Sequence, residues 1–283
     1  MIRASVFLIA MATIFGAIGS LFGVQGAAYA AALSVVIAFW GFWSTPSKLA
    51  AIGAVEVTDP KMIALVHELS ARARIPAPRV FEMNERQPNA LALGPNPQQA
   101  VLVMTTGLRK RLSRAELAAV LGHELAHIRY RDTLVATIGM TFLTAIASLA
   151  LFVGLIGLLV GRNSGGLIIG LAILAPLTGL VVHTAMSRSN EYRADQFGAD
   201  LSGDPKHLIS ALLKLDSAAK RVRNSTVLNR PVLTPLFVVD PTPGSWINAL
   251  FSTHPPIERR IARLEAMRSS AIGSTNLGRI APN

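Results

Sequence analysis

Three long stretches of this sequence contain no Lys, Arg, Asp or Glu, and they constrain the fold more than any other feature. They are residues 4–47, 134–161 and 163–187, with lengths of 44, 28 and 25 residues. A helix crosses the hydrocarbon core of a bilayer with roughly 20 residues. Only 15% of the whole chain is charged, against about a quarter in average proteins, and these stretches account for the missing charge. The sequence therefore predicts a membrane-embedded protein.

The first stretch is too long for one crossing, because a single helix would extend about 66 Å across a core of about 30 Å. A turn at residues 23–26 divides it in two. Four transmembrane helices are thus expected, at residues 4–22, 27–44, 133–160 and 166–186. Helices buried in a soluble protein are a weaker explanation, since three such stretches are hard to bury in one small chain. A signal peptide cleaved after Ala28-Tyr29-Ala30 is weaker too, since another apolar stretch follows at once.

The basic residues near the ends of these helices indicate their orientation, because Lys and Arg collect on the cytoplasmic side. In the four-helix topology only Arg162, between the third and fourth helices, falls on the opposite side. The others share one side: Arg3, Lys48, Arg129, Arg131, Arg188 and Arg193. Both termini and both polar segments are therefore predicted to be cytoplasmic.

The net charge of +11 has the same explanation. Of the 27 basic residues, 25 lie in the polar segments 48–133 and 188–283, where a basic face beside anionic lipid is expected. Nucleic-acid binding is the rival interpretation, but no recognition motif accompanies the charge, so no nucleic-acid partner is predicted. The absence of Cys excludes disulfides and thiolate metal sites, and it fits a reducing compartment.

The polar segments predict a small catalytic domain in two parts, residues 48–132 and 187–269, separated by a transmembrane hairpin. In the first part, Asp59-Pro60 predicts the start of a helix that runs to about Arg74. We expect its buried face to contain Ile63, Val66, Leu69 and Ala73. Short strands are predicted at residues 79–83, 90–93 and 100–105.

Ser113 and Glu116 form a capping box that opens the next helix. No Pro or other strong breaker follows before the end of the third span, so one long helix entering the bilayer is predicted. In the second part, Pro205 and Pro256 each begin a helix. Residues 228–246 are either a lid or a linker, and residues 270–283 are predicted to be a disordered tail.

His123-Glu124-Leu125-Ala126-His127 is an H-E-x-x-H motif on the capped helix. At 100° per residue, the two imidazoles lie one turn apart on one face, where both can hold one zinc ion. Glu124 projects beside the metal and is predicted to be the catalytic base that accepts a proton from water.

A catalytic zinc site needs a third protein ligand and an open position. Glu191 and Asp195 follow the predicted fourth span, four residues apart and therefore on one helix face. Glu191 is predicted to be the third metal ligand. Asp195 is predicted to accept a hydrogen bond from the other nitrogen of a ligating imidazole. An ordinary solvated face is the alternative, but the transmembrane hairpin returns Glu191 to the surface from which His127 departs.

Together these motifs resemble the HtpX-type membrane zinc metalloproteases, a group related to the CAAX prenyl proteases. The resemblance covers nearly the whole chain. The matching stretches are residues 123–127 with Arg131-Asp132, residues 187–195 with Gly198-Ala199, residues 252–261 and, more loosely, Asn89-Ala90-Leu91-Ala92. The resemblance implies a mainly α-helical, membrane-embedded fold of four transmembrane helices plus a small α+β, gluzincin-like catalytic domain.

The resemblance also implies a multi-pass endopeptidase of the bacterial inner (plasma) membrane, with one Zn²⁺ per chain. Such a protein degrades misfolded or damaged membrane proteins as part of quality control in the stress response. Asn89, Ala90, Leu91 and Ala92 would form an edge strand that aligns the substrate through its backbone. Asn190 stands where such proteins often carry Arg, and Leu91 and Leu93 replace aromatic and polar residues, so the substrate preference stays open. The oligomeric state is open as well.

Other histidines have weaker assignments. His254 either stabilises the oxyanion or supports the Pro-Pro turn that follows it, and both roles stay open. His67 and His207 are predicted to be surface residues.

The predicted reaction is hydrolysis of a peptide bond by water, with Glu124 as base and then as acid. One alternative is processing of lipidated or C-terminally modified peptides, as in the CAAX proteases, and four spans rather than a larger helical chamber argue against it. The other is a non-catalytic membrane scaffold that binds zinc structurally. Glu124 beside an open coordination position argues against that alternative.

Overall fold

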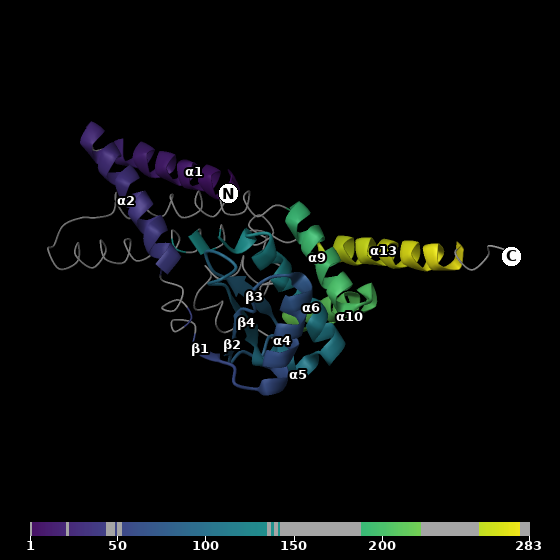
Figure 1. Ribbon diagram of the computed structural model, residues 1–283. Coiled ribbons are helices and arrows are strands. Elements are labelled where there is room, and N and C mark those ends of the chain that lie inside the picture. Colours follow the sequence, from purple (N-terminus) through teal and green to yellow (C-terminus); the bar gives the residue numbers. More distant parts are fainter. Residues whose placement is uncertain are drawn as a thin grey trace.

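The computed structural model describes residues 2–20, 23–43, 49, 53–134, 137–138, 141, 188–221 and 255–277. Two apolar helices lie at one end, and a small sheet covered by helices forms the body below them (Figure 1). The C-terminal helix extends sideways from this body (Figure 1). The described part is therefore mainly helical with one small sheet, as predicted.

The first charge-free stretch forms two helices, α1 (Ile2–Gly19) and α2 (Gly23–Trp43), which pack against each other (Figure 1). They approach closely at Gly19, where a Cβ atom would lie 2.3 Å from the carbonyl oxygen of Gly26. Only a residue without a Cβ fits such a contact. Helix α2 begins at Gly23, before the expected boundary at residue 27.

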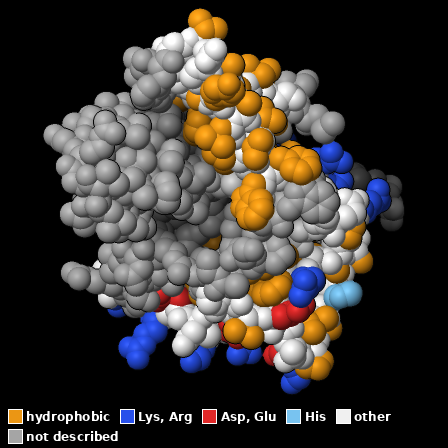
Figure 2. All heavy atoms as spheres, turned by 90° about the vertical axis from the view of Figure 1, so that its left-hand side faces the viewer, with side chains coloured by type: hydrophobic (Ala, Val, Ile, Leu, Met, Phe, Trp, Pro, Cys, Tyr) orange, Lys and Arg blue, Asp and Glu red, His pale blue; other side chains and the backbone are white. Residues whose placement is uncertain are grey.

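Within the described residues, one helical stretch is long and apolar enough to cross a membrane, Gly23–Trp40 of α2, and the apolar part of α1, Leu8–Ala17, is shorter. Large apolar side chains on α2 are exposed, for example Phe39 (67%) and Trp40 (69%). Figure 2 shows hydrophobic side chains gathered over this end of the molecule, whereas charged side chains gather on the body. A surface of this kind suits contact with lipid. The predicted spans at 133–160 and 166–186 lie almost entirely outside the described residues.

Four strands form one sheet in the order β1-β2-β4-β3. Strands β2 (Arg79–Met83) and β3 (Ala90–Leu93) coincide with predicted strands, and β4 (Val101–Thr105) begins one residue later than expected. Strand β1 (Ala54–Glu56) was not predicted, because three residues are too few to show an alternating pattern. Strand β2 is parallel to β4, and β3 is antiparallel to β4 at the sheet's edge.

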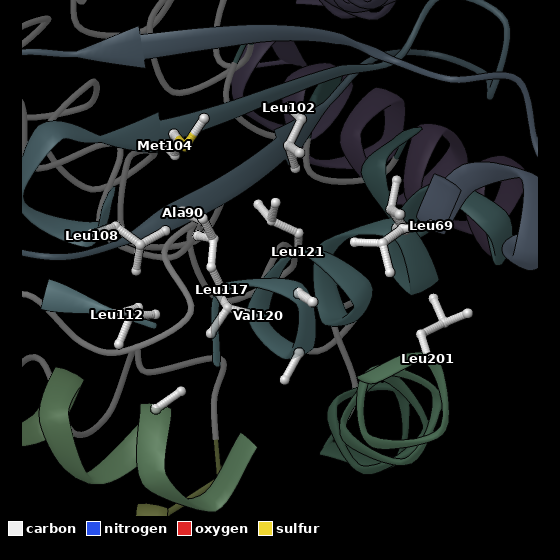
Figure 3. Close-up of a cluster of buried hydrophobic side chains, with 14 of the residues drawn as sticks. Leu69, Ala90, Leu102, Met104, Leu108, Leu112, Leu117, Val120, Leu121 and Leu201 are labelled. Atoms are coloured by element: carbon white, nitrogen blue, oxygen red, sulfur yellow. The ribbon is translucent and has the colours of Figure 1, made fainter. Parts of the chain in front are cut away.

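The two faces of the sheet pack into different apolar clusters, because successive residues of a strand point to opposite faces. Leu102 and Met104 of β4 face the helices, where they meet Leu117 and Leu121 (Figure 3). The intervening Val101 and Val103 belong to the cluster on the other face. Burial on both faces explains why β4 is apolar in its first four residues.

Helix α4 (Pro60–Ala73) begins where predicted, with the Asp59 carboxylate accepting a hydrogen bond from the Lys61 N–H at 3.0 Å. Its buried residues are Met62, Leu65, Val66, Leu69, Ser70 and Ala73. The prediction for Ile63 is wrong, since this side chain is 37% exposed. Ile63 lies about 120° round the helix from Leu69, outside the buried face.

Two helices follow the sheet, α5 (Thr106–Arg111) and α6 (Arg114–Arg129), and the second carries the H-E-x-x-H motif. The predicted capping box is confirmed at its start. The Ser113 N–H donates to Glu116 Oε2 at 2.7 Å, and the Glu116 N–H donates to Ser113 Oγ at 3.3 Å.

The prediction that this helix continues unbroken into the third span is wrong, because α6 ends at Arg129. Tyr130 caps the helix, and Arg131 adopts φ = 61°, in the left-handed region. A residue in that conformation interrupts the helical hydrogen-bond ladder. Helical structure resumes at Asp132, which the interruption turns back toward His127.

The second polar segment forms three described helices, α9 (Arg188–Ser202), α10 (Pro205–Arg221) and α13 (Ile257–Leu277). Helix α13 extends into the segment that was predicted to be a disordered tail, so that prediction is wrong for residues 270–277. The segment contains no Pro before Pro282, so no residue in it blocks the helical backbone, although Gly273, Thr275 and Asn276 favour a helix only weakly.

Glu116 joins the start of α6 to α10. Its carboxylate accepts hydrogen bonds from Ser210 Oγ at 2.6 Å and from Lys214 Nζ at 2.7 Å, and its side chain is 7% exposed. Burial opposes ionisation, but the bonds from Lys214 and Ser210 outweigh it and lower the pKa of Glu116 to about 2.

We expect Glu116→Gln to lower the free energy of unfolding by about 2 kcal/mol at neutral pH, because a charge-assisted hydrogen bond is lost. The folded-state pKa lies below the ordinary value of 4.5. The stabilisation is therefore complete above that pH and is lost as the pH falls toward 2. Thermal unfolding of both proteins between pH 7 and pH 3 measures the effect, and the gap between their midpoints should narrow in acid.

Glu68→Gln is the matched control, since Glu68 is an exposed carboxylate whose nearest basic partner, Arg114, lies 3.8 Å away. Exposed pairs of this kind contribute little, so its midpoint should follow the wild type. If the difference between the unfolding midpoints of Glu116→Gln and the wild type stayed constant down to pH 3, ionisation of Glu116 would not be the source of the stabilisation.

Candidate metal centre between α6 and α9

Three side chains converge where α6 packs on α9. His123 and His127 lie one turn apart on α6, with their Nε2 atoms 3.2 Å from each other. Glu191, in the first turn of α9, places Oε2 3.6 Å from His123 Nε2 and Oε1 3.4 Å from His127 Nε2. One ligand atom from each residue lies within 4.8 Å of the others. The structure thus brings together the three residues predicted to bind the metal.

Two glycines let the backbones of α6 and α9 come into contact. A Cβ atom on Gly198 would lie 2.6 Å from the Ala119 carbonyl oxygen and 2.8 Å from the His123 nitrogen. A Cβ atom on Gly122 would lie 3.1 Å from Gly198 Cα. Glu191 lies two turns before Gly198 on the same face of α9. This close contact therefore sets how near Glu191 comes to the two imidazoles.

The spacing of these groups suits zinc. A tetrahedral site with bonds of about 2.0–2.1 Å holds its ligand atoms about 3.3–3.4 Å apart. The two Nε2 atoms lie 3.2 Å apart, and the two carboxylate oxygens of Glu191 each lie near one of them, at 3.6 and 3.4 Å, so every closest approach is near that value. Imidazole nitrogens and a carboxylate oxygen are also ligand types that zinc accepts. The residues present therefore fit a zinc ion.

The charge around this point also favours a cation. The carboxylates of Glu124, Asp132, Glu191 and Asp195 are all buried there, none more than 7% exposed. Buried carboxylates are unfavourable without positive charge nearby. Burial lowers the pKa of His123 to about 4, which leaves its imidazole neutral as a ligand. Burial also acts to lower the pKa of His127, but the carboxylates of Glu191 and Asp132 outweigh it and raise that pKa to about 9. The surroundings of His127 therefore attract positive charge.

Each imidazole is backed by a carboxylate through its other nitrogen. His123 Nδ1 lies 3.0 Å from Oδ1 of Asp195, the carboxylate that was predicted to accept a hydrogen bond from a ligating imidazole. His127 Nδ1 lies 3.2 Å from Asp132 Oδ2. Contacts of this kind keep the proton on Nδ1 and leave Nε2 available to a metal.

Two residues of this arrangement had no assigned role from the sequence, although both stand in stretches that match the family. Asp132 accepts a hydrogen bond from Asn190 Nδ2 at 3.0 Å as well as contacting His127. It was missed because only the interruption at Arg131 turns it toward the site. Arg260, on α13, donates to both oxygens of Asp195. Arg260 stands in the matching stretch 252–261, but that match alone does not indicate which residue its side chain contacts.

Glu124 is 2% exposed and lies beside these groups. Burial raises the pKa of Glu124 to about 7, while the nearby His127 acts to lower it. A backbone hydrogen bond from Ala92 of β3 also lowers it. A carboxylate that titrates near neutral pH can both accept and release a proton there.

The remaining candidates fall in different places. Asn89 immediately precedes the edge strand β3, and the Thr105 N–H donates to its carbonyl oxygen at 3.0 Å. His67 is exposed, as predicted, whereas His207 is half-buried, with Nδ1 3.2 Å from the Ser202 carbonyl oxygen. His254 and residues 228–246 lie outside the described residues.

Known proteins share these features along most of the chain. The model of Peptidase family M48 matches residues 56–268, which contain every group of the metal centre. A Protease HtpX homolog from Acidiphilium cryptum (strain JF-5) is 41% identical over 281 residues, covering 94% of this chain and 96% of the relative. Another, from Methylibium petroleiphilum, is 38% identical over 278 residues, covering 94% and 97%.

Among solved structures, the crystal structure of S. mikatae Ste24p matches 93% of this chain and 62% of its own. The sequence identity is 18% and the TM-score 0.48, so this likeness carries no argument about function. The family match and the two relatives confirm the resemblance stated from the motifs.

Proposed function

The chain belongs to peptidase family M48, and we propose that it holds one zinc ion through His123, His127 and Glu191 and hydrolyses peptide bonds beside it. It is a membrane metalloprotease of the HtpX type. The observation that carries the residue assignment is the convergence of three ligand atoms within 4.8 Å at the contact of α6 with α9.

Glu124 is the proton-transfer group of the proposed mechanism. A zinc ion, when bound, polarises the scissile carbonyl and lowers the pKa of water. The Glu124 carboxylate accepts a proton from the attacking water and later donates it to the leaving nitrogen. Its pKa, raised by burial to about 7, suits both transfers. Asp195 and Asp132 hold the imidazoles in orientation through their Nδ1 atoms.

We propose that β3 aligns the substrate, which would add to the sheet as a further strand. Strand β3 is at the edge of the sheet, and the backbone hydrogen bond from Ala92 to Glu124 places it beside the proton-transfer group. The residues from Asn89 to Ala92 are at most 7% exposed, so their side chains form no open pocket. Recognition through the backbone of an edge strand would tolerate many sequences.

A broad tolerance of this kind supports misfolded or damaged membrane proteins as substrates. We further propose a multi-pass protein of the bacterial inner membrane, with both termini and the catalytic domain in the cytoplasm. The basic residues beside the apolar stretches support this orientation. The exposed apolar surface of α1 and α2 supports insertion into the membrane.

The absence of Cys makes the topology directly testable, since a single introduced Cys is the only thiol. We expect Ser164→Cys, between the third and fourth predicted spans, to react with a membrane-impermeant maleimide on intact spheroplasts. Ser217→Cys, exposed on α10, should react only after lysis. Labelling of Ser217→Cys on intact spheroplasts would rule out the cytoplasmic orientation.

The proposed activity is tested by removing and restoring the metal. Protein purified in detergent should contain about one zinc per chain and cleave casein. Chelation should abolish cleavage, and an equimolar addition of Zn²⁺ should restore it. Full cleavage by the metal-free protein would exclude the mechanism. Full zinc occupancy without cleavage of any unfolded protein would favour the scaffold alternative, and cleavage confined to C-terminally modified peptides would favour the CAAX-type alternative.

A further inference from the structure

A buried arginine stands behind the metal centre on the C-terminal helix. Arg260 is 1% exposed, and its guanidinium lies against Asp195. Nε donates to Asp195 Oδ2 at 2.8 Å, and Nη2 donates to Asp195 Oδ1 at 2.6 Å. This two-pronged contact fixes the plane of the carboxylate as well as its position.

The same carboxylate contacts the first imidazole. Asp195 Oδ1, which Arg260 binds, lies 3.0 Å from His123 Nδ1. Since the direction of Nε2 follows from the orientation of the ring, a carboxylate held in one orientation also restrains where Nε2 points. Contacts behind the ligands are known to influence metal affinity in this way.

We infer that Arg260 is a positioning residue of the metal centre: it locks Asp195, and through Asp195 it aims the His123 imidazole at the metal. The inference rests on the proposed function, since it concerns the zinc site. It makes α13 a component of that site, although α13 lies far along the chain from the H-E-x-x-H motif.

The second imidazole has a different support. Asp132, behind His127, accepts hydrogen bonds from Asn190 at 3.0 Å and from Arg193 at 3.5 Å. The Arg193 side chain is 39% exposed, whereas the Arg260 side chain is fully buried. A short charge-assisted pair excluded from water is the stronger restraint. The His123 side of the centre should therefore depend more on Arg260 than the His127 side depends on Arg193.

A positioning role and simple charge repulsion predict opposite changes in zinc affinity when Arg260 is removed. Arg260 is a cation near the metal site, so by Coulomb repulsion alone its removal would tighten zinc binding. If Arg260 positions His123, its removal weakens zinc binding instead. Arg260→Gln removes the charge, and Arg260→Lys keeps the charge while losing the two-pronged geometry.

The experiment measures zinc affinity of the full-length protein in detergent, by competition with a chromophoric chelator. We expect Arg260→Gln and Arg260→Lys each to weaken zinc binding by about 10–100-fold. The visible absorption spectrum of the Co²⁺-substituted protein should change as well, because it reports the ligand geometry. Arg259→Gln, at an exposed position one residue earlier on α13, is the matched control and should leave both readouts unchanged.

The same substitution in a protein that already lacks the Asp195 carboxylate separates a positioning role of Arg260 from a general effect on folding. In an Asp195→Asn protein, adding Arg260→Gln should weaken zinc binding no more than about twofold further, because the path through Asp195 is already broken. The double variant removes both charges of the Arg260–Asp195 ion pair together, so the Asp195 carboxylate is not left buried without its partner. It therefore provides the test even where Arg260→Gln alone fails to fold.

Wild-type zinc affinity in Arg260→Gln or Arg260→Lys would overturn the inference, as would tighter binding in Arg260→Gln. The inference would also be overturned if Arg260→Gln weakened zinc binding as much in the Asp195→Asn protein as it does in the wild type. These results would leave the proposed function standing, as long as the wild type binds zinc. A wild-type protein that binds no zinc would overturn the proposed function, and this inference with it.

Discussion

Replacement of Glu124 by Gln should reduce peptide hydrolysis by at least about 100-fold while zinc binding stays at the wild-type level. Gln has nearly the shape of Glu but cannot accept a proton from water, so only the proton-transfer step is removed. The three proposed ligands, His123, His127 and Glu191, are unaltered. Cleavage of casein and zinc content are measured on the same purified samples, so that a loss of metal cannot be mistaken for a loss of chemistry.

A Glu-to-Gln substitution at another position of α6 provides the control. Glu116→Gln removes a carboxylate that contacts α10 rather than the metal centre. It should retain cleavage at 25 °C although it unfolds more easily. Cleavage by a zinc-loaded Glu124→Gln protein at the wild-type rate would remove Glu124 from the mechanism. Zinc loss in Glu124→Gln would instead place its carboxylate among the groups that hold the metal.

Local patterns in the sequence predicted the elements that carry the centre. The capping box at Ser113 predicted the start of α6, and the spacing of His123 and His127 predicted their common face. Glu191 and Asp195 could be chosen because the predicted transmembrane hairpin would return the chain to one surface. Signals of this kind depend only on helix geometry and on neighbouring residues.

The parts that were missed depend on contacts that no local pattern encodes. Asp132 reaches His127 only because Arg131 adopts a left-handed conformation, which its residue type does not indicate. Arg260 meets Asp195 across 65 positions of sequence. The two-pronged contact arises where α13 packs on α9, and periodicity within α13 predicts a buried face but not its partner.

Gly198 was noted in the sequence only as part of a matching stretch, yet its backbone contact predicts one of the largest effects of a single methyl group in this chain. In Gly198→Ala, the added Cβ would lie 2.6 Å from the Ala119 oxygen and 2.8 Å from the His123 nitrogen. These are backbone atoms, so α9 must move away from α6. We expect the free energy of unfolding to fall by about 1–3 kcal/mol. Thermal unfolding of the metal-free protein measures this change.

The same displacement should act on the metal centre, because Glu191 lies on the face of α9 that contacts α6. Zinc affinity and casein cleavage should therefore fall together. Gly122→Ala is the graded control, since its Cβ would meet Gly198 Cα at 3.1 Å and Leu201 Cβ at 3.3 Å. Ala favours a helix by about 1 kcal/mol over Gly at both positions, but the contact at Gly122 is looser, so the loss should be smaller there. Equal stability and zinc affinity in Gly198→Ala and wild type would show that the close contact does not set the position of Glu191.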